Sequence, residues 1–112
     1  MRPVHDTPPD LGRYTGPATM ILTSLAGGPK HGYALIKDIE ELAGVVLGPG
    51  TLYGALSRLE DQGLVEPTGE EGRRRPYRLT GPGAQALAAH LQAQRAVVDT
   101  GLRRLSVGGA WA

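Results

Sequence analysis

The chain has 112 residues, a length typical of one domain and too short for two independent hydrophobic cores. It has no cysteine, which excludes disulfide frameworks, thiolate zinc sites, iron–sulfur clusters and cysteine nucleophiles. The net charge is only +1, so the overall balance does not indicate nucleic-acid binding, and only local clusters of charge are informative.

Residues 1–15 are expected to form a disordered arm, because they are mainly polar and contain several prolines. The beginning of this arm has no apolar segment of the kind found in signal peptides. The longest uncharged run, between Arg13 and Lys30, has 16 residues and is too short to span a bilayer. We therefore expect a soluble, cytoplasmic protein with no membrane partner.

Three short helices are predicted after the arm, because apolar residues recur there every third and fourth position. They cover residues 17–26, 31–42 and 51–62, and clusters of glycine and proline separate them. The residues expected to face the core are Ala18, Ile21, Leu22, Leu25, Ala26, Leu35, Ile36, Ile39, Leu42, Leu52, Leu56 and Leu59.

A β-hairpin and a long final helix are predicted next. Residues 64–67 and 77–80 alternate like short strands, and the charged segment 68–75 connects them. The final helix is expected from Pro82 to about Leu105, with Thr80 or Gly81 as its cap. Its expected apolar face consists of Ala84, Leu87, Ala88, Leu91, Ala96, Val98, Leu102 and Leu105.

This order of elements is that of a winged helix-turn-helix, a mainly α fold with a small β-hairpin. We expect a DNA-binding domain over 16–80, a dimerisation helix over 81–106 and a flexible tail over 107–112. The hairpin loop is then the wing, and it carries three consecutive arginines, Arg73, Arg74 and Arg75. Arginines at this position suit phosphates or a narrow minor groove, and a solvated run of charge is the alternative.

Three stretches resemble the PadR family of bacterial transcriptional regulators. Residues 31–39 (HGYALIKDI) resemble the family's HGY helix, 49–65 (PGTLYGALSRLEDQGLV) its recognition-helix signature, and 72–83 (GRRRPYRLTGPG) its wing. The departures are Gly54, where the family usually has proline, and Pro76, where it usually has an aromatic or basic residue. Because the chain stops soon after the final helix, it resembles the short, single-domain subgroup.

The resemblance implies that the third predicted helix reads DNA. Tyr53 lies off the apolar stripe, so its hydroxyl is expected to reach DNA, and packing on the second helix is the alternative. Gly50 and Thr51 begin the helix, where free N–H groups attract phosphate, although plain capping is equally consistent. The full set of expected DNA contacts is His31, Tyr33, Gly50, Thr51, Tyr53, Ser57, Arg58, Arg73, Arg74 and Arg75.

Two further contacts in this set also have competing explanations. Arg58 could bind a guanine or pair with Glu60 or Asp61 on its own helix. Tyr33 could contact phosphate or lie in the core.

No catalytic motif is found: there is no nucleophile elbow, phosphate loop or HExxH sequence, and we expect no enzymatic activity. The three histidines, His5, His31 and His90, are too scattered in sequence to form a metal site. We therefore expect neither a metal nor a cofactor.

The second half of the final helix predicts a homodimer, because a winged-helix core of this size cannot cover its apolar face. Leu91, Val98, Leu102 and Leu105 are expected to pack against a second copy. The alternative is a monomer whose helix folds back or frays after Gly101. A two-fold dimer implies an inverted-repeat operator in double-stranded DNA.

The expected function is therefore a dimeric regulator, a repressor released by a small-molecule effector. The final helix has no aromatic residue before Trp111, so an aliphatic-lined effector cleft, or no effector, is as consistent as a stacking pocket. The competing function is a winged-helix module that binds only an acidic protein partner.

Overall fold

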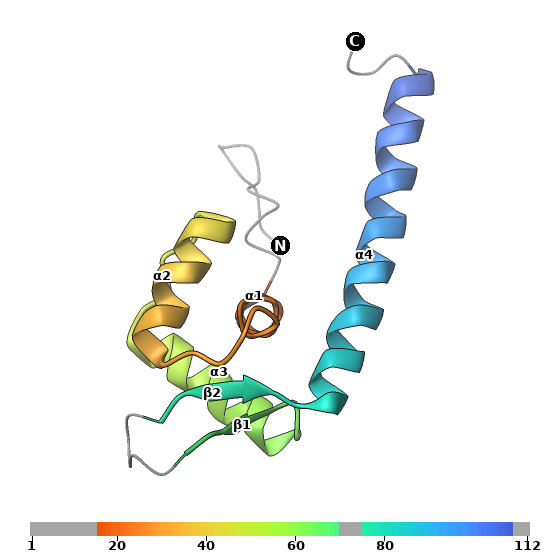
Figure 1. Ribbon diagram of the computed structural model, residues 1–112. Coiled ribbons are helices and arrows are strands. Elements are labelled where there is room, and N and C mark those ends of the chain that lie inside the picture. Colours follow the sequence, from red (N-terminus) through yellow and green to blue (C-terminus); the bar gives the residue numbers. More distant parts are fainter. Residues whose placement is uncertain (1–15, 70–74, 109–112) are drawn as a thin grey trace, which may run out of the picture.

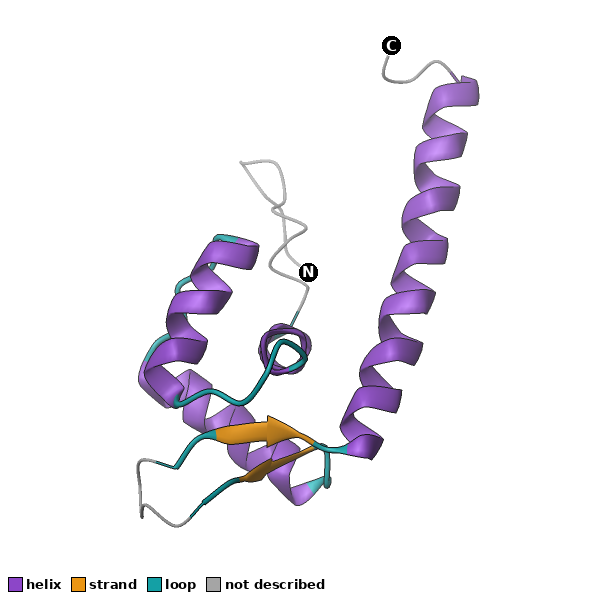
Figure 2. Ribbon diagram, viewed as in Figure 1, coloured by secondary structure: helices purple, strands orange, loops and turns teal. Residues whose placement is uncertain are grey.

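The computed structural model describes residues 16–69 and 75–108. Figures 1 and 2 show the short helices packed with a small hairpin, and the long final helix extending away from them. This is the predicted winged helix-turn-helix. The elements in chain order are α1 (Pro17–Leu25), α2 (Gly32–Ala43), α3 (Pro49–Asp61), β1 (Val65–Pro67), β2 (Tyr77–Leu79) and α4 (Gly81–Gly108).

Proline and glycine set the limits of the short helices. Pro17 and Pro49 lie in the first turns of α1 and α3, where a missing N–H leaves no helical hydrogen bond unmade. Gly44 ends α2 in the left-handed conformation, with φ of 69°. Helix α3 begins at Pro49, two residues before its predicted start. Helix α2 begins at Gly32, one residue after its own predicted start.

The core is aliphatic and is shared by the helices and β1. Its buried members are Met20, Ile21, Leu22, Leu25, Leu35, Ile39, Leu47, Leu52, Ala55, Leu56, Leu59, Val65 and Leu87. Three residues predicted to face the core are exposed instead: Ala18, Ala26 and Leu42. Each lies at or just beyond the end of its helix, where the neighbouring elements no longer cover the stripe.

The hairpin pairs Val65 with Leu79 and Pro67 with Tyr77. Lys30, in the connection between α1 and α2, forms an isolated antiparallel bridge with Tyr77 on the free side of β2. Figure 1 shows this connection running beside β2. The helix pair and the wing are therefore joined through the main chain.

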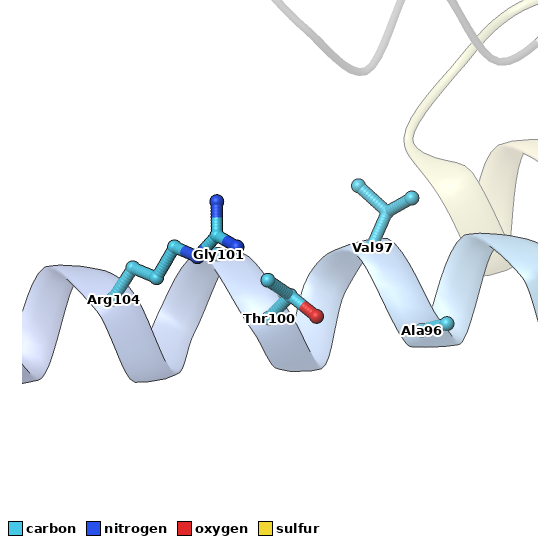
Figure 3. Close-up of a pocket in the computed structure, with 5 residues that line it drawn as sticks. All are labelled: Ala96, Val97, Thr100, Gly101 and Arg104. Carbon is cyan, nitrogen blue, oxygen red and sulfur yellow. The ribbon is translucent and has the colours of Figure 1, made fainter.

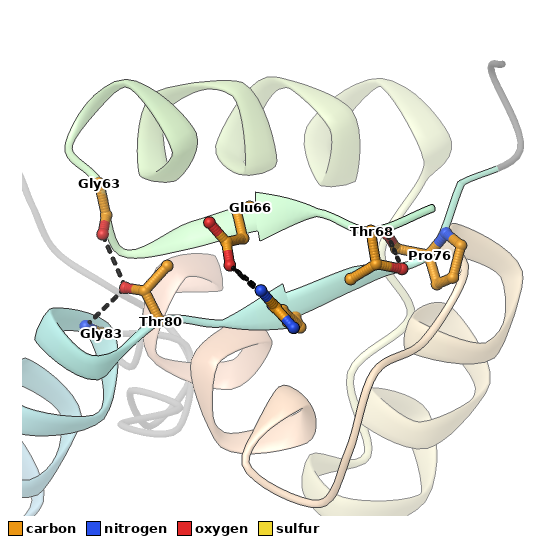
Figure 4. A network of polar contacts seen from close by, with 7 residues as sticks. Gly63, Glu66, Thr68, Pro76, Thr80 and Gly83 are labelled. Carbon is orange, nitrogen blue, oxygen red and sulfur yellow. Dashed lines mark hydrogen bonds and ion pairs between the residues drawn. The ribbon is translucent and has the colours of Figure 1, made fainter. Parts of the chain in front are cut away.

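Thr80 caps α4, as predicted. Its Oγ1 accepts a hydrogen bond from the Gly83 N–H at 3.0 Å and donates one to the Gly63 carbonyl at 2.7 Å (Figure 4). A Cβ on Gly83 would overlap the Leu64 carbonyl oxygen, so only glycine allows α4 to start this close to β1.

Helix α4 has 28 residues, which corresponds to about 42 Å. It continues through Gly101 without a break and ends at Gly108. The helix therefore neither folds back nor frays after Gly101. Only Gly83 and Leu87 are buried along it. Leu91, the first of the residues expected to pack against a second copy, is already 41% exposed. The helix leaves the domain after little more than two turns.

Candidate nucleic-acid interface

The outward face of α3 carries the side chains predicted to read DNA. Leu52, Ala55, Leu56 and Leu59 face the core, which leaves Tyr53, Ser57 and Arg58 exposed. Gly50 and Thr51 are exposed in the first turn. Among the described residues, no ion pair joins Arg58 to Glu60 or Asp61. The guanidinium is therefore not held by its own helix.

Tyr53 has two environments at once. It is 47% exposed, yet its hydroxyl end lies over Gly32 at the start of α2. A Cβ on Gly32 would overlap that hydroxyl and would contact a methyl group of Leu52. Tyr53 therefore packs on the second helix, as the alternative predicted, while part of its ring stays exposed. The contact with Gly32 fixes the direction of that exposed part.

The start of α2 adds a second exposed group of polar and aromatic side chains. His31 is the N-cap residue, and its side chain is exposed and makes no capping hydrogen bond. Tyr33 is 73% exposed, so the alternative that it lies in the core is wrong. The Nζ of Lys37 lies 5.9 Å from the centroid of the Tyr33 ring. We did not predict Lys37 as a site residue, although its spacing of four residues from Tyr33 placed it on the same face.

Both described arginines of the wing are exposed, and one of them is paired with a carboxylate. Arg75 is exposed in the loop two residues before β2. Arg78 binds the Glu66 carboxylate across the hairpin, with Nε and Nη2 both 2.6 Å from Oε2 (Figure 4). The predicted contacts Arg73 and Arg74 lie outside the described residues. Of the two described wing arginines, Arg75 is the one without a carboxylate partner among the described residues.

Pro76 closes the base of the wing without needing an N–H. Its carbonyl accepts hydrogen bonds from the Thr68 N–H at 2.8 Å and from Thr68 Oγ1 at 3.3 Å (Figure 4). The next residue, Tyr77, returns the chain toward α3. Burial raises the pKa of the Tyr77 hydroxyl, with Glu60 adding to the rise, Arg75 opposing it and Tyr53 adding slightly. The wing base and the recognition helix therefore lie within electrostatic reach of each other.

The predicted dimerisation residues form one stripe along α4. Leu91, Val98, Leu102 and Leu105 are separated by seven, four and three residues, so they share a side of the helix. Leu87, four residues before Leu91, lies on the same side and is buried in the core. The stripe thus continues the core's own face into a region where all four side chains are at least 41% exposed.

A shallow hollow lies on another side of α4 (Figure 3). It has a volume of about 410 Å³, and Ala96, Val97, Thr100, Gly101 and Arg104 line it. The lining is aliphatic with one hydroxyl and one guanidinium, and it contains no aromatic ring. Neither Thr100 nor Arg104 was among the residues considered from the sequence for an effector site.

The described residues place limits on other kinds of site. They contain no group of three or more histidine, aspartate and glutamate side chains that could hold a metal ion. None of the described helices has the length and hydropathy needed to cross a membrane.

Comparison with known proteins agrees with this geometry. The chain is 53% identical over 68 residues to a 37.1 kDa protein in transposon TN4556 of Streptomyces fradiae, a match that covers 61% of this chain and 20% of that protein. It is 34% identical over 93 residues to the transcriptional regulator YqjI of Escherichia coli, covering 81% of this chain and 44% of that one. The chain thus spans less than half the length of these two relatives.

A solved structure of a transcriptional regulator from Clostridium thermocellum matches with a TM-score of 0.71 and 29% identity. The match covers 87% of this chain and 96% of that chain. The model of the PadR-like transcriptional regulator family matches residues 21–89, well over half of the chain. The chain therefore belongs to the PadR-like family of transcriptional regulators, which are non-enzymatic DNA-binding proteins.

Proposed function

We propose that this chain acts in the cytoplasm as a homodimeric, sequence-specific repressor that binds an inverted-repeat operator and leaves it when a small molecule binds. The observation that carries the proposal is the uncovered stripe of α4. Four large aliphatic side chains continue the core's face beyond the domain, and in the single chain they are 41–52% exposed. Burying one leucine or valine fully is worth about 1.5–3 kcal/mol, so a second copy of the same stripe is a strongly favourable cover.

The DNA-binding surface is proposed to combine α3, the start of α2 and the wing. Tyr53, Ser57 and Arg58 face outward from α3, the helix that enters the major groove in this fold. Free N–H groups at Gly50 and Thr51 would bind a phosphate at the same helix end. His31 and Tyr33 would contact the backbone beside it, and Arg75, together with Arg73 and Arg74, would contact the flanking phosphates or minor groove.

The proposal also includes repression of transcription and release of the operator by an effector. A dimer that covers an operator blocks transcription without needing a further surface. The open hollow on α4 would offer an effector an aliphatic contact surface, formed by Ala96, Val97 and Gly101 of one helix. Arg104 at its rim would favour an acidic group on that ligand.

The decisive experiment selects bound sequences from random double-stranded DNA and then measures binding to the selected site. We expect an inverted repeat with half-sites about one helical turn apart, bound far more tightly than either half-site alone. Sedimentation should give twice the 11.8 kDa chain mass. A chain that enriches no DNA sequence and shows no salt-dependent retention on DNA or heparin would support the competing function, a module for an acidic protein partner.

A further inference from the structure

One buried polar side chain connects the first two helices. Ser24 is 2% exposed, and it is the only polar side chain among the described residues that is buried to this degree. Its hydroxyl donates a hydrogen bond of 2.5 Å to Oδ2 of Asp38 on α2. A buried hydroxyl is costly unless it is paired, so this bond selects one relative position of α1 and α2.

Lys30 completes the network from the connection between those helices. Its Nζ donates to the Ser24 carbonyl at 2.5 Å and to the Gly28 carbonyl at 3.4 Å, and it lies 4.0 Å from Oδ2 of Asp38. The ammonium group thus binds carbonyls at the C-terminal end of α1, where the helix dipole favours a cation. Lys30 and Asp38 are both largely shielded, with 21% and 35% of their side chains exposed.

The main chain of Lys30 pairs with the wing. Its N–H donates to the Tyr77 carbonyl at 3.0 Å, and its carbonyl accepts from the Tyr77 N–H at 2.9 Å. Lys30 therefore binds α1 and α2 through its side chain and β2 through its backbone. Tyr77 lies two residues after Arg75, the exposed arginine at the base of the wing.

We propose that Ser24, Lys30 and Asp38 form a clamp that positions the wing against the helix-turn-helix pair. The three are positioning residues, because they act on DNA binding through the wing. An aliphatic contact between α1 and α2 would stabilise the helices equally well, but it would not fix the backbone of Lys30 beside β2. The consequence for DNA affinity rests on the proposed function, whereas the clamp itself does not.

Hydrogen exchange tests the clamp without DNA. Lys30→Met keeps an unbranched side chain, one atom shorter than lysine, and removes its charge. We expect the Tyr77 amide to exchange about tenfold faster in Lys30→Met and in Ser24→Ala, because the bridge to Lys30 opens more often. The amide of Leu56 in α3 should be unchanged. Lys37→Met, which removes the other lysine of the chain from an exposed position on α2, is the matched control and should leave Tyr77 protected.

The exchange result judges the clamp directly. Unchanged protection of Tyr77 would overturn it, and so would an equal rise at Tyr77 and Leu56, because an equal rise reports only global destabilisation. If Lys30→Met does not fold, Ser24→Ala, which removes a single hydroxyl, provides the same comparison.

A double-mutant cycle then tests the effect on DNA. Arg75→Ala is measured in the wild-type protein and in the clamp variant. We expect Arg75→Ala to cause a severalfold smaller loss of DNA affinity in the clamp variant. In that variant the displaced wing no longer places Arg75 against DNA. If the fold-losses of affinity caused by Arg75→Ala and by the clamp substitution simply multiply in the double variant, the positioning role is overturned. A wild-type protein in which Arg75→Ala has no effect would contradict the proposed wing contact, and the exchange result would still decide the clamp.

Discussion

Tyr53 on α3 places its hydroxyl end in the space that a Cβ on Gly32 would occupy, so the two helices of the helix-turn-helix meet at a residue without a side chain. The same tyrosine is 47% exposed. Contact with Gly32 therefore determines the direction of a side chain that also belongs to the proposed DNA-binding surface. We therefore expect helix packing and DNA recognition to be coupled at this residue pair.

Gly32→Ala should move Tyr53 rather than unfold the protein. The group it would meet first is the free end of a half-exposed ring, so we expect a loss of about 1 kcal/mol in the free energy of unfolding. DNA affinity should fall as far as in Tyr53→Ala. Gly54→Ala is the control: its Cβ would lie 3.7 Å from Nη1 of Arg58, an ordinary contact, and alanine favours a helix by about 0.5–1 kcal/mol. Full DNA affinity in Gly32→Ala would contradict the coupling.

Tyr53→Phe isolates the hydroxyl. If that oxygen binds DNA, affinity should fall by about 0.5–1.5 kcal/mol, and by more if its partner is a phosphate. The melting temperature should barely change, because the ring stays over Gly32. A titration of labelled operator DNA and a thermal melt provide the two measurements. Unchanged affinity combined with a lower melting temperature would assign the hydroxyl to packing alone.

The two described wing arginines should differ in their effect on salt dependence. Arg75→Ala removes an exposed cation, so the slope of log K against log salt should flatten by about 0.9 if Arg75 binds one phosphate. Arg78→Ala is the matched control, because Arg78 is already bound to Glu66 across the hairpin. It should leave the slope unchanged and cost at most about 1 kcal/mol of stability. Equal slopes in wild type and Arg75→Ala would remove Arg75 from the interface.

The chain's turns were predictable because glycine and proline act locally. Gly44 and Pro49 mark helix limits through their own backbone preferences, whatever packs around them. Thr80 was identified as a cap for the same reason, since a capping hydroxyl bonds a residue three positions away. The recognition helix followed from its apolar stripe, which left Tyr53 facing elsewhere.

Relationships between distant segments could not be predicted in this way. Periodicity indicates which side of α4 is apolar, but it does not show at which residue the helix leaves the core, and the structure places that point just after Leu87. Tyr33 was left undecided because its burial depends on how the start of α2 packs against α3. The network of Ser24, Lys30 and Asp38 depends on how α1 and α2 pack against each other, and no local sequence motif predicts it.

Tyr77 should make stability depend on pH in the alkaline range. An unfolded tyrosine loses its proton near pH 10, whereas burial raises the pKa of Tyr77 in the folded chain. The folded state therefore holds the proton more tightly. Its contribution is complete below about pH 10 and is lost as the pH rises through the folded pKa. Denaturant midpoints of wild type and Tyr77→Phe, measured from about pH 8 to 11, should diverge only above about pH 10. Parallel profiles would show that the hydroxyl of Tyr77 is not perturbed.

The last prediction concerns the stripe on α4, on which the proposed operator symmetry depends. Leu102→Asp places a charge at the centre of a surface that must be desolvated in a dimer, so sedimentation at micromolar concentration should show the mass fall toward 11.8 kDa. The single chain should keep its fold, because Leu102 is 44% exposed there and touches no core residue that defines the domain.

Val107→Asp is the matched control for this substitution. Five residues along a helix turn a side chain by about 140°, so Val107 points away from the stripe, and it is 86% exposed. We expect Val107→Asp to remain dimeric and to bind the inverted repeat with wild-type affinity. Leu102→Asp should bind the inverted repeat no more tightly than it binds a single half-site. The half-site comparison matters because losing the dimer removes the second recognition helix and leaves the first intact. A wild-type chain that sediments as a monomer, with a mass and stability that Leu102→Asp does not alter, would refute the dimer and the two-fold operator together.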